Sequence, residues 1–327
     1  MERRQQYPQP QIPSHAHACA GMTWLLSSNK PGTPTPDRVG RAGHGRFFIF
    51  DCFSQEKRVF LLLETIASLN LMKIQYASDL HLELAENSRY LKEHPLEVAG
   101  DVLLLAGDTI YLGQESLMKH PFWHWAADHF EQVIAVPGNH EYYAYYDIAT
   151  QPESFQMELF PNVRICSNTI EHIGNVDIIA STLWAHIEPQ DAYYTQRSVS
   201  DFYRIMYGDH LLTADDFNRE HERCLQFVNQ AVAESKAKTK IVLTHHVPTG
   251  LCTSHEFVGS RINGAFTVEL GNYIAESSID YWIYGHSHRN IKAQIGETVI
   301  LSNQLGYVSH GEHLVNGFTP GKVIEVL

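Results

Sequence analysis

The sequence lacks the features that mark several common protein classes. No run of 18 or more apolar residues is present, so no membrane-spanning helix is predicted. The five cysteines are widely scattered and form no Cys-x-x-Cys pair. This cysteine usage is typical of a reducing compartment, and we expect a cytoplasmic location. A G-x-S-x-G segment is also missing, so nothing indicates a serine nucleophile.

Basic side chains are few. The 327 residues contain 24 Lys and Arg against 37 Asp and Glu, a formal net charge of −13. The excess of acidic side chains lies after residue 71, because residues 1–71 carry eight basic and five acidic side chains. An acidic body argues against extended binding of nucleic acid, which requires clustered Lys and Arg. It does not exclude phosphate substrates, since bound cations can dominate a local field.

The first 71 residues differ from the rest of the chain. Residues 1–45 are rich in Pro, Gln, Ser and Gly and show no apolar period, which is typical of disorder. Residues 59–71 resemble the apolar part of a signal peptide, but their late position and Glu64 count against one. We expect residues 1–71 to be a disordered leader or an over-extended N-terminus, Met72 to be the true start, and residues 72–327 to form one domain.

From Met72 onward, short apolar segments alternate with helical patterns. Strands are predicted at 73–77, 101–106, 132–136, 176–183, 240–244, 280–284, 291–301 and 322–326. Helices are predicted at 121–131 and 213–236, and Thr213 and Asp216 have the spacing of a capping box. This alternation indicates an α/β layered architecture with its functional residues at the carboxyl ends of the strands.

Polar clusters follow five of the predicted strands. They are Asp79-Leu80-His81, Gly107-Asp108, Gly138-Asn139-His140-Glu141, Thr244-His245-His246 and Gly285-His286-Ser287-His288. Carboxylate oxygen, amide oxygen and imidazole nitrogen suit Mn, Fe or Zn. Alternate residues of an extended segment face the same side, so Asp-x-His and His-x-His can each supply two ligands.

Together the clusters resemble the signature of the calcineurin-like metallophosphoesterases, which reads D-x-H, G-D, G-N-H-[DE], H and G-H-x-H. The resemblance extends from about residue 79 to residue 288. It implies a four-layer α/β/β/α sandwich of the bacterial, single-domain type. It also implies a dinuclear metal site at the carboxyl ends of the strands.

The resemblance assigns a role to each cluster. It implies two divalent ions (Mn, Fe or Zn), the first of them held by Asp79, His81, Asp108 and His288. Asp108 would bridge to the second ion, which Asn139, His245 and His286 would also hold. A hydroxide that bridges the metals would attack phosphorus. His140 matches the family's catalytic histidine, which binds no metal and stabilises the transition state or protonates the leaving oxygen.

Several neighbouring residues are candidates for contact with the substrate. His245 directly follows its strand and is taken as the ligand, which leaves His246 to face the substrate or to support the ligands. Arg261, Asn263 and Arg289 are candidate phosphate contacts, because they lie in or beside loops that should overhang the site. Glu83 and Glu141 are expected behind the ligands or in solvent. Four tyrosines after the third cluster could line a pocket or pack in the core, namely Tyr142, Tyr143, Tyr145 and Tyr146.

One departure from the family narrows the expected substrate. The stretch from Gly107 to Gly113 lacks the second Asp and the Arg of the Ser/Thr protein phosphatase branch, which argues against a phosphoprotein substrate. We expect a phosphoesterase acting on a small phosphomonoester or phosphodiester. Two alternatives are a nuclease and a non-catalytic binding scaffold on the same fold, although the complete ligand set argues against the scaffold.

Overall fold

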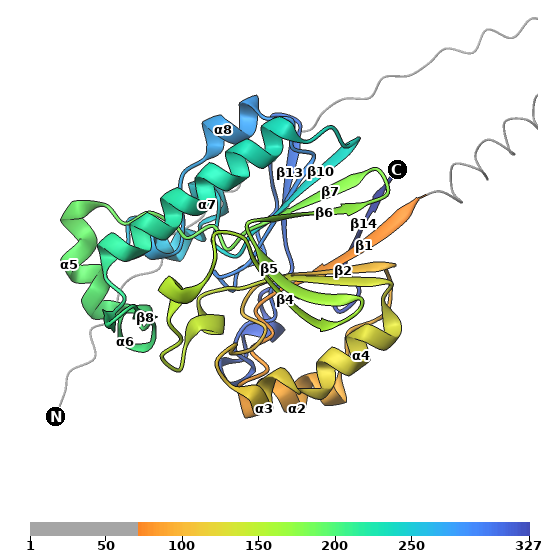
Figure 1. Cartoon of the computed structure of the whole chain (residues 1–327), viewed down its shortest axis with the longest axis horizontal. Coiled ribbons are helices and arrows are strands. Elements are labelled where there is room, and N and C mark those ends of the chain that lie inside the picture. The colour runs from red at the N-terminus through yellow and green to blue at the C-terminus, as the bar shows by residue number, and fades with distance from the viewer. Residues whose placement is uncertain (1–70) are drawn as a thin grey trace, which may run out of the picture. The chain divides into compact units, whose positions relative to one another are not determined.

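The computed structural model describes residues 71–327. The expected leader therefore lies outside the described residues, except for Leu71, and so do Cys19 and Cys52. The described part is an α/β structure built on two six-stranded sheets. Figure 1 shows the two sheets facing each other, with helices on the outer side of each.

The first sheet has the strand order β14-β1-β2-β3-β5-β4. Its central strands run parallel and its two edge strands are antiparallel to their neighbours. The bounds are Met72–Ala77 (β1), Val102–Ala106 (β2), Gln132–Val136 (β3), Phe155–Phe160 (β4), Val163–Ser167 (β5) and Val323–Val326 (β14).

The second sheet has the order β12-β13-β11-β10-β7-β6 and the same plan, with parallel central strands and antiparallel edges. Its bounds are Thr169–Ile173 (β6), Val176–Ala180 (β7), Thr239–Leu243 (β10), Tyr281–Tyr284 (β11), Ala293–Ile295 (β12) and Thr298–Ser302 (β13). A separate two-stranded ribbon pairs Met206–Tyr207 (β8) with His210–Leu211 (β9).

Helices complete the layers. Three lie on the first sheet's side, at Ala85–Glu93 (α2), Glu115–Met118 (α3) and Pro121–His129 (α4). The others are Pro189–Ser198 (α5), Asp201–Arg204 (α6), Ala214–Glu234 (α7) and Gly271–Glu276 (α8), of which α7 and α8 lie on the second sheet (Figure 1). Short 3-10 helices occur at His140–Tyr142, Ile148–Thr150, Gly250–Cys252, His255–Phe257, Asn263–Ala265, Val308–His310 and Glu312–Leu314. Among the described residues, we find no helix with the length and apolar character that crossing a bilayer requires.

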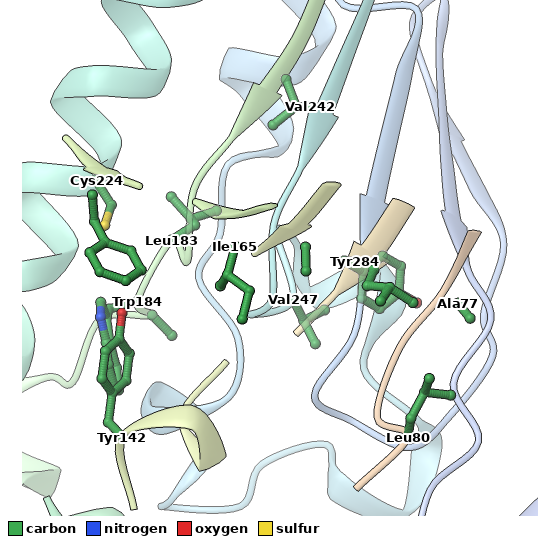
Figure 2. Packing of buried hydrophobic residues seen from close by; sticks show 14 of the residues in the cluster. Ala77, Leu80, Tyr142, Ile165, Leu183, Trp184, Cys224, Val242, Val247 and Tyr284 are labelled. Atoms are coloured by element: carbon green, nitrogen blue, oxygen red, sulfur yellow. The ribbon is translucent and has the colours of Figure 1, made fainter. Parts of the chain in front are cut away.

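The central strands are buried on both faces, so their sequences are continuously apolar. In β2, Leu104 belongs to the apolar cluster between the sheets, whereas Leu103 and Leu105 belong to the cluster beneath the helices. Side chains alternate between the faces of a strand, and each face here meets a packed layer. Figure 2 shows part of the cluster beneath the helices, where Tyr142 packs against Trp184 with ring centroids 5.8 Å apart.

The predicted helix at 213–236 is confirmed as α7. The amide of Asp216 donates to the Thr213 hydroxyl at 3.2 Å, and the amide of Thr213 donates to the Asp216 carboxylate at 3.0 Å, which completes the capping box. The helix buries Phe217, Cys224 and Val228 against the second sheet.

Three predicted boundaries were wrong. The strand that begins at Val176 ends at Ala180, and at Leu183 the chain has a left-handed φ of 46°. The predicted strand at 291–301 is a hairpin of β12 and β13, with Gly296 at φ 58° in its turn. Helix α4 ends at His129, two residues before the predicted end, and the exposed ring of His129 hydrogen-bonds the Trp125 carbonyl in the last turn.

Candidate active site

The five polar clusters meet at the carboxyl ends of the two sheets. The first sheet supplies Asp79 and His81 after β1, Asp108 after β2, and Asn139 and His140 after β3. The second supplies His245 after β10, and His286 and His288 after β11. All of these side chains are buried. The topology therefore brings together residues that are up to 209 positions apart in the sequence.

Backbone strain is concentrated at this site. Five of the seven expected ligands have a positive φ, namely Asp79 (54°), His81 (46°), Asp108 (53°), His286 (74°) and His288 (50°). Such a conformation costs on the order of 1–3 kcal/mol for a residue with a side chain and clusters at functional sites. Hydrogen bonds fix it here, for example from the His286 amide to the Asp79 carboxylate at 3.0 Å. Close packing also fixes it, because a Cβ at Gly138 would collide with the Asp108 carboxylate.

One group of ligand atoms comes from Asp79, His81, Asp108 and His288, and these atoms lie within 4.8 Å of one another. The Nε2 atoms of His81 and His288 are 3.0 Å apart. The carboxylate of Asp79 lies 3.3 Å from His288 Nε2, and that of Asp108 lies 3.7 Å from His81 Nε2.

A second group shares Asp108 and adds His245 and His286. The Nε2 atom of His245 lies 3.3 Å from an Asp108 oxygen and 3.1 Å from His286 Nδ1. It also lies 3.0 Å from the amide oxygen of Asn139, which makes that oxygen a fourth member of this group.

The outward nitrogen of each of these histidines has an acceptor of its own. His245 Nδ1 donates to the Ala106 carbonyl at 2.9 Å, and His286 Nε2 donates to the Ala265 carbonyl at 3.2 Å. His81 Nδ1 faces Glu83 at 3.1 Å and His288 Nδ1 faces Glu312 at 2.6 Å. These contacts hold one ring proton on the outer nitrogen of each histidine, which leaves the inner nitrogen as the atom that can supply a lone pair to a metal ion.

These donor sets fit divalent metal ions. Two ligands that each lie about 2.1 Å from one ion, at a right angle, are about 3.0 Å apart, close to the separations of the inner nitrogens. Burial and the nearby carboxylates of Glu141 and Asp79 raise the pKa of Asp108 well above its usual value. Burial also lowers the pKa of His81 to about 4, so its ring is neutral at pH 7 and free to coordinate. A cation would offset the crowded carboxylates and the facing lone pairs.

His140 lies beside the two groups and contacts other partners. Its Nδ1 lies 2.9 Å from Glu83 Oε1, the oxygen that also faces His81 Nδ1. Its Nε2 lies 3.2 Å from the Tyr307 hydroxyl, and its ring stacks on Tyr143 with centroids 4.3 Å apart. Burial opposes the charged form of Glu83, but the hydrogen bonds with His140 and His81 outweigh it and lower the pKa of Glu83 to about 2. Glu83 is therefore ionised and accepts both ring protons.

Two acidic residues hold the ligand loops in place. The buried carboxylate of Glu141 accepts from the amides of Asp108 (2.9 Å), Thr109 (2.7 Å) and Gly138 (2.7 Å), and so ties together the loops after β2 and β3. Asp201 accepts from the side-chain amide of Asn139 at 2.8 Å, which turns the Asn139 oxygen toward His245. Sequence reasoning missed Asp201, since no motif surrounds it.

A cavity of about 340 Å³ opens above the two groups. Asn263 and Arg289, two of the expected substrate contacts, line it. The structure places the other two elsewhere. The ring of His246 is fully buried and does not line the cavity, but it lies 4.4 Å from the ring of the expected ligand His286 and 5.1 Å from that of Trp184 between ring centroids, which is the alternative place behind the ligands.

The guanidinium of Arg261 is bound outside the cavity lining, where it donates to Asp191 at 2.8 Å and lies over the ring of Tyr194. Three of the four tyrosines after β3 take one of the two expected roles. Tyr143 lines the cavity and Tyr142 and Tyr146 pack in the core, whereas Tyr145 is exposed.

Comparison with known proteins identifies the family of this chain. A family model described as calcineurin-like phosphoesterase matches residues 72–290. Uncharacterized protein L509 of Acanthamoeba polyphaga mimivirus is 29% identical over 279 residues, which cover 77% of this chain and 96% of that protein. The crystal structure of a phosphopantetheinyl hydrolase from Mycobacterium tuberculosis has a TM-score of 0.54 and 15% identity, covering 78% of this chain and 95% of that one. At that identity the likeness is one of fold.

Proposed function

Because the chain belongs to the calcineurin-like phosphoesterase family, it is a metal-dependent hydrolase of phosphoester bonds, and we propose that it acts on small phosphate esters. The family is dependent on a dinuclear metal site, and the structure has a buried cluster of histidines and aspartates. The observation that carries the proposal is that two ligand groups share a single residue, Asp108.

The proposed ligands follow from the two groups. Asp79, His81, Asp108 and His288 would hold one ion, and Asp108, Asn139, His245 and His286 would hold the other. When bound, two such cations activate water as the nucleophile and offset the negative charge of the phosphate. The contacts of Glu312 with His288 and of Asp201 with Asn139 orient those ligands before binding.

His140 is proposed as the group that handles the proton of the leaving oxygen. Its backbone amide donates to Asp108 at 2.9 Å, which fixes the residue beside the ligands, and its side chain lines the cavity. Glu83 accepts the Nδ1 proton, so Nε2 is the atom that can release a proton to the ester oxygen. A positioned acid of this kind contributes a rate factor of about 10² to 10⁴.

The test is His140→Ala, with the exposed His124→Ala as a matched control. Metal analysis should find both ions in each variant, whereas the hydrolysis rate should fall by about 10² to 10⁴ in His140→Ala alone. The loss should be smaller for p-nitrophenyl esters, whose leaving group needs little protonation. Loss of a metal ion from His140→Ala, or full activity without His140, would contradict the assigned role.

A further inference from the structure

The walls of the active-site cavity indicate which phosphate ester enters it. We propose that the substrate is a phosphodiester with two uncharged ester groups, an inference that rests on the function proposed above. At neutral pH a phosphomonoester carries close to two negative charges, because its second pKa is about 6, whereas a diester carries one. The two classes therefore differ in how much positive charge they require beyond the metal ions.

Among the described residues that line the cavity, Arg289 supplies the one arginine or lysine side chain. Its Nε donates to Glu256 at 2.8 Å, and one Nη donates to the His288 carbonyl at 3.1 Å. The same guanidinium lies 3.8 Å from Glu312 and over the ring of Phe257. The positive charge of Arg289 is therefore already matched by carboxylates, and the side chain is held against the wall.

The other ionisable residues that line the cavity are His140, three of the proposed ligands, two tyrosines, and the carboxylates of Glu312 and Asp201. The Glu312 carboxylate faces His288 Nδ1 at 2.6 Å. Asp201 also lines the cavity, behind Asn139. Neither carboxylate adds positive charge to the cavity, so the described lining residues leave no unmatched arginine or lysine to meet the second negative charge of a monoester.

The remaining walls suit neutral organic groups. Tyr143, Phe257, Phe266 and Tyr307 present aromatic surface, and serine and threonine hydroxyls such as those of Ser200 and Thr253 present hydrogen-bonding groups. A cavity of about 340 Å³ lies in the usual range for a small-molecule site. Such walls can accept an aromatic or hydroxylated ester group on either side of the phosphate.

The experiment compares two esters with the same leaving group, p-nitrophenyl phosphate and phenyl p-nitrophenyl phosphate, using the metal-loaded protein. We expect kcat/KM for the diester to exceed that for the monoester by about tenfold or more, which corresponds to one unmatched charge near a carboxylate. Failure to hydrolyse either ester would contradict the proposed function itself. An equal or higher kcat/KM for the monoester would leave that function standing and overturn the diester proposal.

A second variant tests the physical reason. Glu256→Gln removes an exposed partner of Arg289 that lies outside the cavity lining, and so frees the guanidinium to meet a second phosphate charge. The ratio of diester to monoester kcat/KM should fall about three- to tenfold. The exposed Glu276→Gln on α8 is the matched control and should leave the ratio unchanged. An unchanged ratio in Glu256→Gln would overturn the charge argument on which the proposal rests.

Discussion

Glu83 connects the proposed metal site to His140, the proposed catalytic histidine, through a single oxygen atom. Its Oε1 accepts from His81 Nδ1 at 3.1 Å and from His140 Nδ1 at 2.9 Å. The sequence around Asp108 lacks the second Asp of the protein phosphatase branch, and Glu83 is the carboxylate that contacts His140 in this chain. Glu83→Gln keeps the size of the side chain and removes its charge.

The contacts set the size of the effect. A hydrogen bond to a charged group contributes about 1.5–3 kcal/mol and a neutral one about 0.5–1.5 kcal/mol. Replacing two charged contacts by neutral ones should therefore cost about 2–3 kcal/mol, part of it in metal affinity and part in catalysis. At saturating metal, kcat/KM should fall about 10- to 100-fold, the range typical of residues that orient metal ligands.

The assay measures kcat/KM and metal content together, with the exposed Glu86→Gln of α2 as the control. If Glu83 acts through His140, its effect should shrink in the His140→Ala background, because a double-mutant cycle isolates the coupling between two residues. An unchanged kcat/KM in Glu83→Gln, or an equal loss with and without His140, would refute this reasoning.

Three further predictions follow from the same site. Asp108→Asn should abolish activity and lower the metal content of both positions, since a neutral oxygen cannot offset two dications; two fully occupied positions by elemental analysis would contradict it. Burial opposes the charged form of His288, but contacts with Asp79 and Glu312 raise its pKa to about 9, so the ring carries a second proton at pH 7. Binding of metal at pH 7 should release this proton, and the affinity for metal should rise with pH up to about 9. Calorimetry in buffers of different ionisation enthalpy would count the proton, and none released would contradict it. A chain beginning at Met72 should keep its activity and metal content, because every proposed site residue lies within residues 79–312; an insoluble or inactive truncated protein would contradict it.

Much of the fold was predictable from the sequence because the central strands are short apolar runs that end at polar clusters. Strands β4, β5 and β6 were missed. The edge strands β4 (Phe155–Phe160) and β6 (Thr169–Ile173) are only partly buried and mix polar with apolar residues, and the five residues of β5 include Arg164 and Ser167. The end of β7 was misplaced for a different reason. Thr182 and Leu183 favour a strand as Ile178 and Ile179 do, but the backbone leaves the sheet after Ala180 to join the loops around the site.

The residues of the site were also only partly predictable from the sequence. The expected ligands were recognisable from local spacing, since each follows its strand within a few residues. The partners that orient them come from distant segments, as Asp201 does for Asn139 and Glu312 for His288, and no local pattern marks them. His246 shows the converse. Its position beside His245 allows a role near the substrate or behind the ligands, and only tertiary packing places its ring outside the cavity, against His286 and Trp184.

Reconstitution of the metal-free protein tests the central claim most directly. The protein is stripped with a chelator, titrated with Mn²⁺ or Zn²⁺, and assayed for hydrolysis of a p-nitrophenyl ester. The account predicts no hydrolysis without metal, and activity that rises to a plateau at two equivalents per chain. Full activity in the stripped protein, or a plateau at one equivalent, would contradict the two-metal site.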